Sequence, residues 1–236
     1  MRLCFLGDSH LGAIRSAWVS SRADATFFAL PGKGMAHLEV HDGALLSHQP
    51  KAAEILFRIS GGKDRIDGNY GTYVLHGMHL GMAETLSTLR DMRDLGAPVK
   101  LVGTPDFRTA LRKAIEDSLA LNTLRKLRQI SDAPAIVSPT PLMDAQFMGL
   151  RNRLVEFSVA GQLASLFIEE CGDVCQGLGA EFVPQPPETL AADGLATRPE
   201  YTEGAARFSA RAAEGDNVHM NAQYGAAVIE RVMAAL

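Results

Sequence analysis

Short apolar runs that each stop at a turn residue recur along the chain, and they constrain the fold more than any other feature. Each run is three to six residues long and ends at Gly, Ser, Pro or a His-Gly pair; the runs are 2–6, 25–30, 72–75, 135–137 and 181–183. Runs of this length that end at turn residues predict buried strands.

Longer helical patterns fill the gaps between these strands. Apolar residues recur at helical spacing over residues 10–22, 82–95, 106–130, 144–178 (one bent helix or two) and 219–236. Strands that alternate with helices predict a parallel sheet with both faces covered. We therefore expect an α/β fold, a three-layer α/β/α sandwich around a mainly parallel five-stranded sheet.

Residues 36–70 do not fit this alternation. Residues 37–46 alternate like a hairpin around Asp42-Gly43, a dipeptide typical of tight turns. Pro50 to Phe57 is compatible with a helix or a strand, so the sequence leaves this insert unassigned.

Composition narrows the class of protein. The 236 residues are 47% hydrophobic and 21% charged, which suits one domain spanning 1–236. The net charge is −4 with scattered Lys and Arg, so a nucleic-acid partner is not expected. The basic residues of 106–130 are interpreted as a solvated helix face.

The N-terminal apolar run is too short for a signal peptide and no later run could span a membrane, which favours a cytoplasmic protein without a membrane partner. Homo-oligomer formation is left open.

Cysteine and histidine spacing gives no reason to expect a metal or cofactor. Cys4, Cys171 and Cys175 form an odd set without paired zinc-ligand spacing, so we expect reduced, buried thiols. His37 and His41 lie four apart, a spacing that binds zinc on a helix, but no third ligand is near and the segment alternates like a strand.

Two blocks at opposite ends of the chain carry residues suited to nucleophilic chemistry. Ser9 follows Gly7-Asp8 after the first strand, where its hydroxyl could be a nucleophile or an ordinary helix N-cap. Asp216 and His219 precede the last helix and supply the carboxylate and imidazole that activate a serine, although Asp216 could instead cap that helix with His219 merely exposed.

Together the two blocks resemble the signature of the SGNH (GDSL-like) hydrolase family, which is Gly-Asp-Ser after the first strand and Asp-x-x-His before the last helix. Residues 5–10 resemble the first block, and residues 216–225, including Asn221 and Tyr224-Gly225, resemble the last. The resemblance implies a flavodoxin-like strand order and a cofactor-free serine esterase. In it Ser9 attacks the ester, His219 transfers the proton and Asp216 orients His219.

The resemblance also implies an oxyanion hole. Its donors would be the Ser9 amide, a glycine amide after the second strand, either Gly32 or Gly34, and a side chain after the third strand. The family's asparagine at this last position is His79 here, in Gly77-Met78-His79. A neutral imidazole can still donate one hydrogen bond. The replacement leaves open a divergent esterase, an acyltransferase with the same triad, or an inactive relative that only binds.

The expected substrate is a short acyl, acetyl-type ester of a carbohydrate or other small molecule. The chain shows no long amphipathic lid or membrane-seeking segment that a lipid–water interface would favour.

Overall fold

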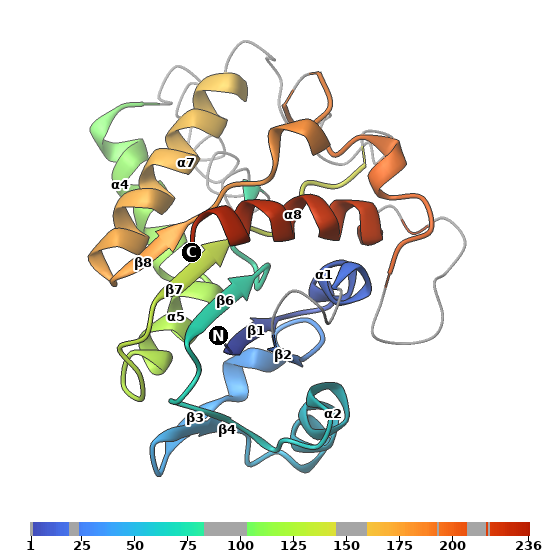
Figure 1. The fold of residues 1–236 in the computed structure, drawn as a ribbon. Helices are drawn as coiled ribbons and strands as arrows, with labels where there is room; N and C mark the ends of the chain where they lie inside the picture. The colour runs from blue at the N-terminus through green and yellow to red at the C-terminus, as the bar shows by residue number, and fades with distance from the viewer. Residues whose placement is uncertain are drawn as a thin grey trace.

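A parallel five-stranded sheet lies at the centre of the computed structural model, which describes residues 2–18, 24–82, 103–144, 160–192, 194–206, 216 and 218–236 (Figure 1). The strand order is β2-β1-β6-β7-β8, and every neighbouring pair is parallel. This is the flavodoxin-like order, and the expected α/β class is confirmed. The strands are β1 (Arg2–Gly7), β2 (Asp24–Ala29), β6 (Thr72–His76), β7 (Ala135–Ser138) and β8 (Ala180–Phe182).

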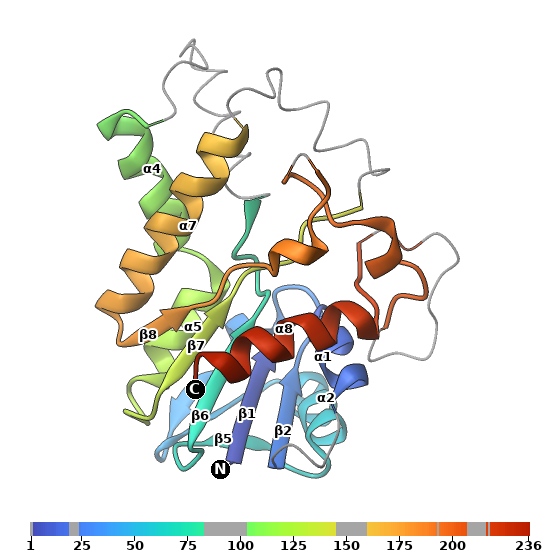
Figure 2. The ribbon, with the colours of Figure 1, turned by 45° about the horizontal axis from the view of Figure 1, so that its top comes forward.

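Helices cover both faces of this sheet, which makes three layers (Figures 1 and 2). Side chains alternate along β1, so Leu3 and Phe5 enter one core and Cys4 and Leu6 the other. The first core is closed by α1 (Leu11–Ala17) and α8 (Ala222–Ala234), and the second by α4 (Pro105–Glu116), α5 (Leu119–Leu127) and α7 (Ala160–Gly177).

The first and last helices of the chain pack directly against each other. A Cβ added at Gly225 of α8 would lie 2.1 Å from the carbonyl oxygen of Ala13 in α1, so only glycine allows this approach. The contact brings the segment before α8 to the turn after β1, although the two are more than 200 residues apart in sequence.

The insert between β2 and β6 forms a small second sheet and a helix. The sheet is antiparallel, with the order β3 (Glu39–His41), β4 (Ala44–Leu46) and β5 (Arg65–Asp67), after a short 3-10 helix η1 (Gly34–His37). The hairpin turns at Asp42 and Gly43, whose φ values of 48° and 72° fit a type I′ turn; this agrees with the hairpin-like alternation of a segment that the sequence left unassigned. Pro50 to Phe57 is helical, within α2 (Pro50–Ser60) against β2.

The remaining helices match the sequence patterns in position but differ in length. The single helix expected over 106–130 is two, because the Ser118 hydroxyl accepts the amide of Leu121 at 3.3 Å and caps the start of α5. The helix expected over 10–22 ends at Ala17, and the one expected over 219–236 begins at Ala222. Most of the helix expected over 82–95 lies outside the described residues, as do residues 145–159 of the helical segment expected over 144–178.

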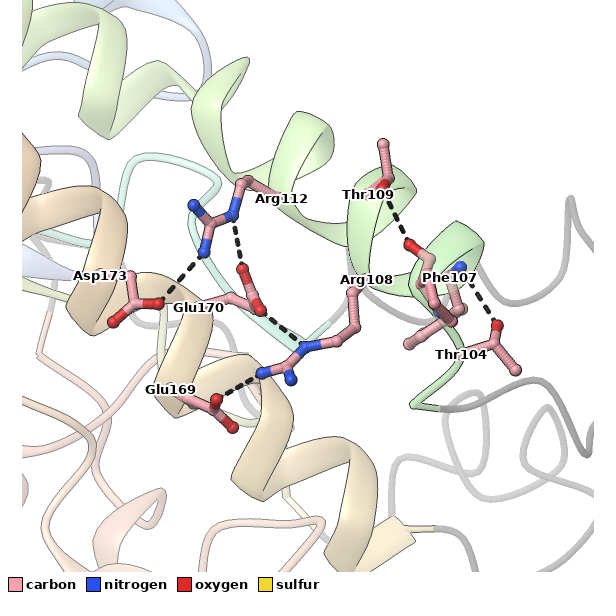
Figure 3. Close-up of polar contacts among 9 residues, drawn as sticks. Thr104, Phe107, Arg108, Thr109, Arg112, Glu169, Glu170 and Asp173 are labelled. Atoms are coloured by element: carbon pink, nitrogen blue, oxygen red, sulfur yellow. Dashed lines mark hydrogen bonds and ion pairs between the residues drawn. The ribbon is translucent and has the colours of Figure 1, made fainter.

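Part of the basic face of α4 contacts α7, which corrects its interpretation as a purely solvated surface, although Arg108 and Arg112 stay partly exposed and Lys113 is exposed as expected. Glu170 of α7 is only 2% exposed and accepts from Arg108 Nε at 2.9 Å and Arg112 Nε at 2.7 Å (Figure 3). Arg108 also pairs with Glu169, and Arg112 with Asp173. The two arginines thus fix α4 against α7.

The three cysteines are free and buried, as predicted from their number and spacing. In the described part of the chain, none of the helices is both long enough and apolar enough to cross a membrane.

Candidate active site

Ser9 lies in the tight turn that joins β1 to α1 at the carboxyl edge of the sheet. The turn is packed closely, since a Cβ at Gly7 would come within 2.8 Å of the His76 carbonyl oxygen of β6. The N-cap of α1 is His10, which makes no capping hydrogen bond with its side chain. The alternative of Ser9 as an ordinary N-cap is therefore not what the structure adopts.

Hydrogen bonds connect Ser9, His219 and Asp216 in one line. Ser9 Oγ lies 2.8 Å from Nε2 of His219, and the other ring nitrogen, Nδ1, lies 2.9 Å from Asp216 Oδ2. The imidazole is 14% exposed and the carboxylate 4% exposed, so solvent reaches the ring but hardly the acid. An arrangement of this kind can pass a proton from the hydroxyl to the ring while the carboxylate fixes the ring tautomer.

Asp216 is held as a carboxylate in a nearly buried position. Burial works against ionisation, but hydrogen bonds from the His219 ring and from the backbone N–H groups of His219 and Val218 outweigh it and lower the pKa of Asp216 from 3.8 to about 2. Both backbone donors reach Oδ1 at 3.1 Å, and the imidazole Nδ1 lies 2.9 Å from Oδ2 and 3.1 Å from Oδ1. Asp216 therefore closes its own loop rather than capping α8.

The N-cap of α8 is Asn221, two residues after His219. Its side-chain oxygen accepts the amides of Gln223 and Tyr224 at 3.0 and 3.1 Å, and its Nδ2 donates to the carbonyls of Glu200 and Glu203. The asparagine of the C-terminal block thus fixes the start of the helix and the segment beside it, which positions His219.

Asp8 ties the turn that carries Ser9 to the turn after β6, a role that the sequence analysis did not assign. It is 5% exposed, and its two oxygens accept the amides of His10 at 3.0 Å and Met78 at 2.8 Å. Gly77 has φ +78°, and a Cβ there would lie 2.8 Å from Asp8 Oδ1. The only sequence signal for this role was the aspartate of the Gly-Asp-Ser motif, to which the sequence analysis assigned no function.

The candidate oxyanion donors follow neighbouring strands at this same edge. Gly32 has φ +56° in the turn after β2, whereas Gly34 begins η1 and donates its amide to Pro31 at 3.1 Å. His79 follows β6, is partly buried, and has φ +57° directly after Met78 at φ +55°. Consecutive left-handed residues other than glycine are costly and persist only where the surroundings impose them.

The other histidines lie apart from this line of hydrogen bonds or beneath it. His76 is fully buried, with Nδ1 3.2 Å from Ser138 Oγ, and burial together with nearby His10 lowers its pKa to about 3. His37 lies in η1 and His41 in β3, where the His41 ring meets His48 rather than His37, at 5.8 Å between centroids. Within the ranges that the structure describes, no group of three or more His, Cys, Asp or Glu could hold a metal ion.

A largely apolar pocket opens further along the same edge, beyond the ends of β7 and β8. It holds about 450 Å³ including its mouth, and its walls include Phe167 and Ile168 of α7, Leu142 after β7 and Pro184 after β8. Ser9 and His219 do not line it.

Comparison with known proteins adds little to this geometry. No family model matches the chain, and no curated protein matches it. Among solved structures, a protein of Streptococcus pneumonia provisionally named a platelet activating factor is similar, with a TM-score of 0.45 and 11% sequence identity over 99% of this chain and 82% of that chain. A similarity this low says nothing about activity, and the fold class follows from the sheet order and layers.

Proposed function

We propose that the protein is a serine hydrolase of carboxylic esters, of the SGNH type, with Ser9 as nucleophile. The observation that carries this proposal is the hydrogen-bonded line from Ser9 Oγ through both ring nitrogens of His219 to Asp216. A carboxylate and an imidazole activate a serine hydroxyl when the three groups are joined in this order. Here they meet at the carboxyl edge of a parallel sheet, where ligands of such folds bind.

The reaction proceeds through an acyl-enzyme. His219 Nε2 accepts the Ser9 proton as Oγ attacks the ester carbonyl, and Asp216 stabilises the imidazolium that forms. His219 then returns the proton to the leaving alcohol, which departs and leaves the acyl group on Ser9. Water attacks this ester in the same way: His219 takes its proton, and the carboxylic acid leaves as Ser9 Oγ is reprotonated.

The negative charge of the tetrahedral intermediate is held by the Ser9 amide, the Gly32 amide and His79 in this proposal. Gly32 is preferred over Gly34 because the Gly34 amide is already donated to Pro31. The left-handed backbone at His79 supports a positioned side chain there. Donors of this kind contribute roughly 3 kcal/mol each in acyl transfer.

The substrate we propose is a short acyl, acetyl-type ester of a carbohydrate or other small molecule. The alternative function with a specific observation in its favour is that of a noncatalytic binding protein, because His79 replaces the family's asparagine. The complete Ser9, His219 and Asp216 geometry weighs against it, since a protein that only binds has no need to keep all three groups in line.

The direct test is hydrolysis of p-nitrophenyl acetate by the wild type, by Ser9→Ala and by the control Ser16→Ala. Ser16 is an exposed serine on the adjacent helix α1, so its loss removes a hydroxyl without touching the site. The proposal expects Ser16→Ala to match the wild type and Ser9→Ala to lose turnover. Equal rates for Ser9→Ala and the wild type would refute it. Adding acceptor alcohols in the same assay separates hydrolysis from acyl transfer.

A further inference from the structure

His10 lies flat against the imidazole that we propose as the base. The ring centroids of His10 and His219 are 5.1 Å apart and their planes differ by 27°, which is a stacked arrangement. His10 is only 9% exposed, so the face of His219 that it covers packs against the His10 ring and not against solvent.

The position of His10 is set by the protein and does not depend on substrate. Its backbone N–H donates to Asp8 Oδ1 at 3.0 Å, and its carbonyl accepts the amide of Ala13 at 3.3 Å as α1 begins. Asp8 is itself fixed by the amide of Met78 at 2.8 Å. The turn that presents Ser9 therefore also presents the surface on which His219 rests.

We propose that His10 is a positioning residue that acts through His219, as a neutral aromatic wall that keeps Nε2 of the base directed at Ser9. The inference rests on the proposed function. Asp216 and Ser9 hold the two nitrogen-bearing edges of the ring and neither of its faces, and the terminal torsion of histidine is broad, so these edge contacts leave the ring some freedom to tilt. A flat neighbour on one face removes that freedom.

The wall serves this purpose only while His10 is uncharged. Burial lowers the pKa of His10, and nearby His219 and His79 lower it further, against the opposing carboxylates of Asp8 and Asp216. Buried His76 also faces this group and has a pKa of about 3. Burial therefore favours the uncharged form of His10. A neutral ring face attracts the imidazolium form of His219, whereas a protonated His10 would repel it.

The test compares His10→Phe, which keeps a flat ring, with His10→Ala, which removes it, in full kinetics with p-nitrophenyl acetate. His41→Ala, at an exposed histidine of the β3–β4 hairpin, is the control. We expect His10→Ala to lower kcat by roughly ten- to a hundredfold with KM nearly unchanged, since misplacing a catalytic group costs rate rather than binding. His10→Phe should restore kcat to within about threefold of wild type and keep the acid limb of the pH profile where it is, because a neutral ring is replaced by a neutral ring.

Two results would overturn the inference. A wild-type kcat in His10→Ala would show that His219 needs no wall, and an acid limb displaced in His10→Phe would show that His10 titrates with the base. The rate at which a fluorophosphonate labels Ser9 in each variant reports the same base without turnover, and it should fall in His10→Ala. If wild-type turnover did not depend on Ser9, the proposed function would fail first and His10 with it; Ser9-dependent turnover that is unaltered in His10→Ala would sink this inference alone.

Discussion

Replacing Asp216 with asparagine should nearly abolish activity although the two side chains have the same shape. Oδ1 of Asp216 accepts two backbone N–H groups at 3.1 Å, so the oxygen of an asparagine must stay there. Its NH₂ group then takes the place of Oδ2, 2.9 Å from His219 Nδ1. A donor at that point replaces the shorter of the two contacts that Nδ1 makes with the carboxylate; the other, 3.1 Å to Oδ1, is shared with two backbone N–H groups. The change therefore favours an accepting Nδ1 and moves the ring proton to Nε2, which can no longer take the proton of Ser9.

The size of the effect follows from two consequences of the change. The pKa of Asp216 is about 2 against an ordinary 3.8, so its surroundings favour the carboxylate over the neutral acid by about 2.5 kcal/mol. The wrong tautomer adds to the loss of that charge, and in a Ser-His-Asp triad the same substitution lowers kcat about ten-thousandfold, or about 5 kcal/mol in the barrier.

The assay is kcat for p-nitrophenyl acetate, with Asp173→Asn as the control. Asp173 is an exposed carboxylate paired with Arg112 between α4 and α7, away from Ser9, so its loss should leave the rate unchanged. A rate for Asp216→Asn within tenfold of the wild type would refute the tautomer argument and, with it, the role of Asp216.

Three further outcomes test other parts of the structure. Because the pKa of Asp216 is depressed in the folded state, its stabilisation is present above its ordinary 3.8 and is lost as the pH falls through the folded value. We expect the wild type to lose about 2 kcal/mol of unfolding free energy relative to Asp216→Asn as the pH falls from about 6 to about 2, in urea titrations at each pH. Glu170→Ala should lower the unfolding free energy by about 1–2 kcal/mol, a value reduced because the arginine partners of Glu170 are partly solvated. Glu169→Ala, which removes an exposed ion pair, should lower it by under about 1 kcal/mol, and equal losses in the two variants would contradict the central role of Glu170. Gly77→Ala should cost about 2 kcal/mol and lower turnover, because φ is +78° and the new Cβ would meet Asp8; an unaltered denaturation midpoint would show that the turn can relax.

The sequence predicted the sheet well because each strand is a local signal. An apolar run that ends at a turn residue can be recognised without its neighbours in the fold, and the ends of the five runs match the ends of the five strands to within one residue. Helix ends were less predictable. The apolar stripe continues across Asp117 and Ser118, and the capping hydroxyl that divides α4 from α5 is a single side chain within it.

Contacts between distant segments could not be read from the sequence. Asp8 bonds to an amide 70 residues away, and Arg108 and Arg112 meet a carboxylate about 60 residues away, so in the sequence they look like a motif residue and a solvated face. Ser9, Asp216 and His219 were expected as a set because their two blocks together resemble one family signature, and the structure joins them by hydrogen bonds. The preference for Gly32 over Gly34 in the proposed oxyanion hole rests on the backbone hydrogen bond that occupies the Gly34 amide, which the sequence does not show.

Intact mass after treatment with a small fluorophosphonate tests the central claim most directly, because such reagents react with a serine hydroxyl only when a base activates it. Wild type and Ser16→Ala are expected to gain one adduct each, and Ser9→Ala none. An unlabelled wild type, or an adduct that survives Ser9→Ala, would contradict the account.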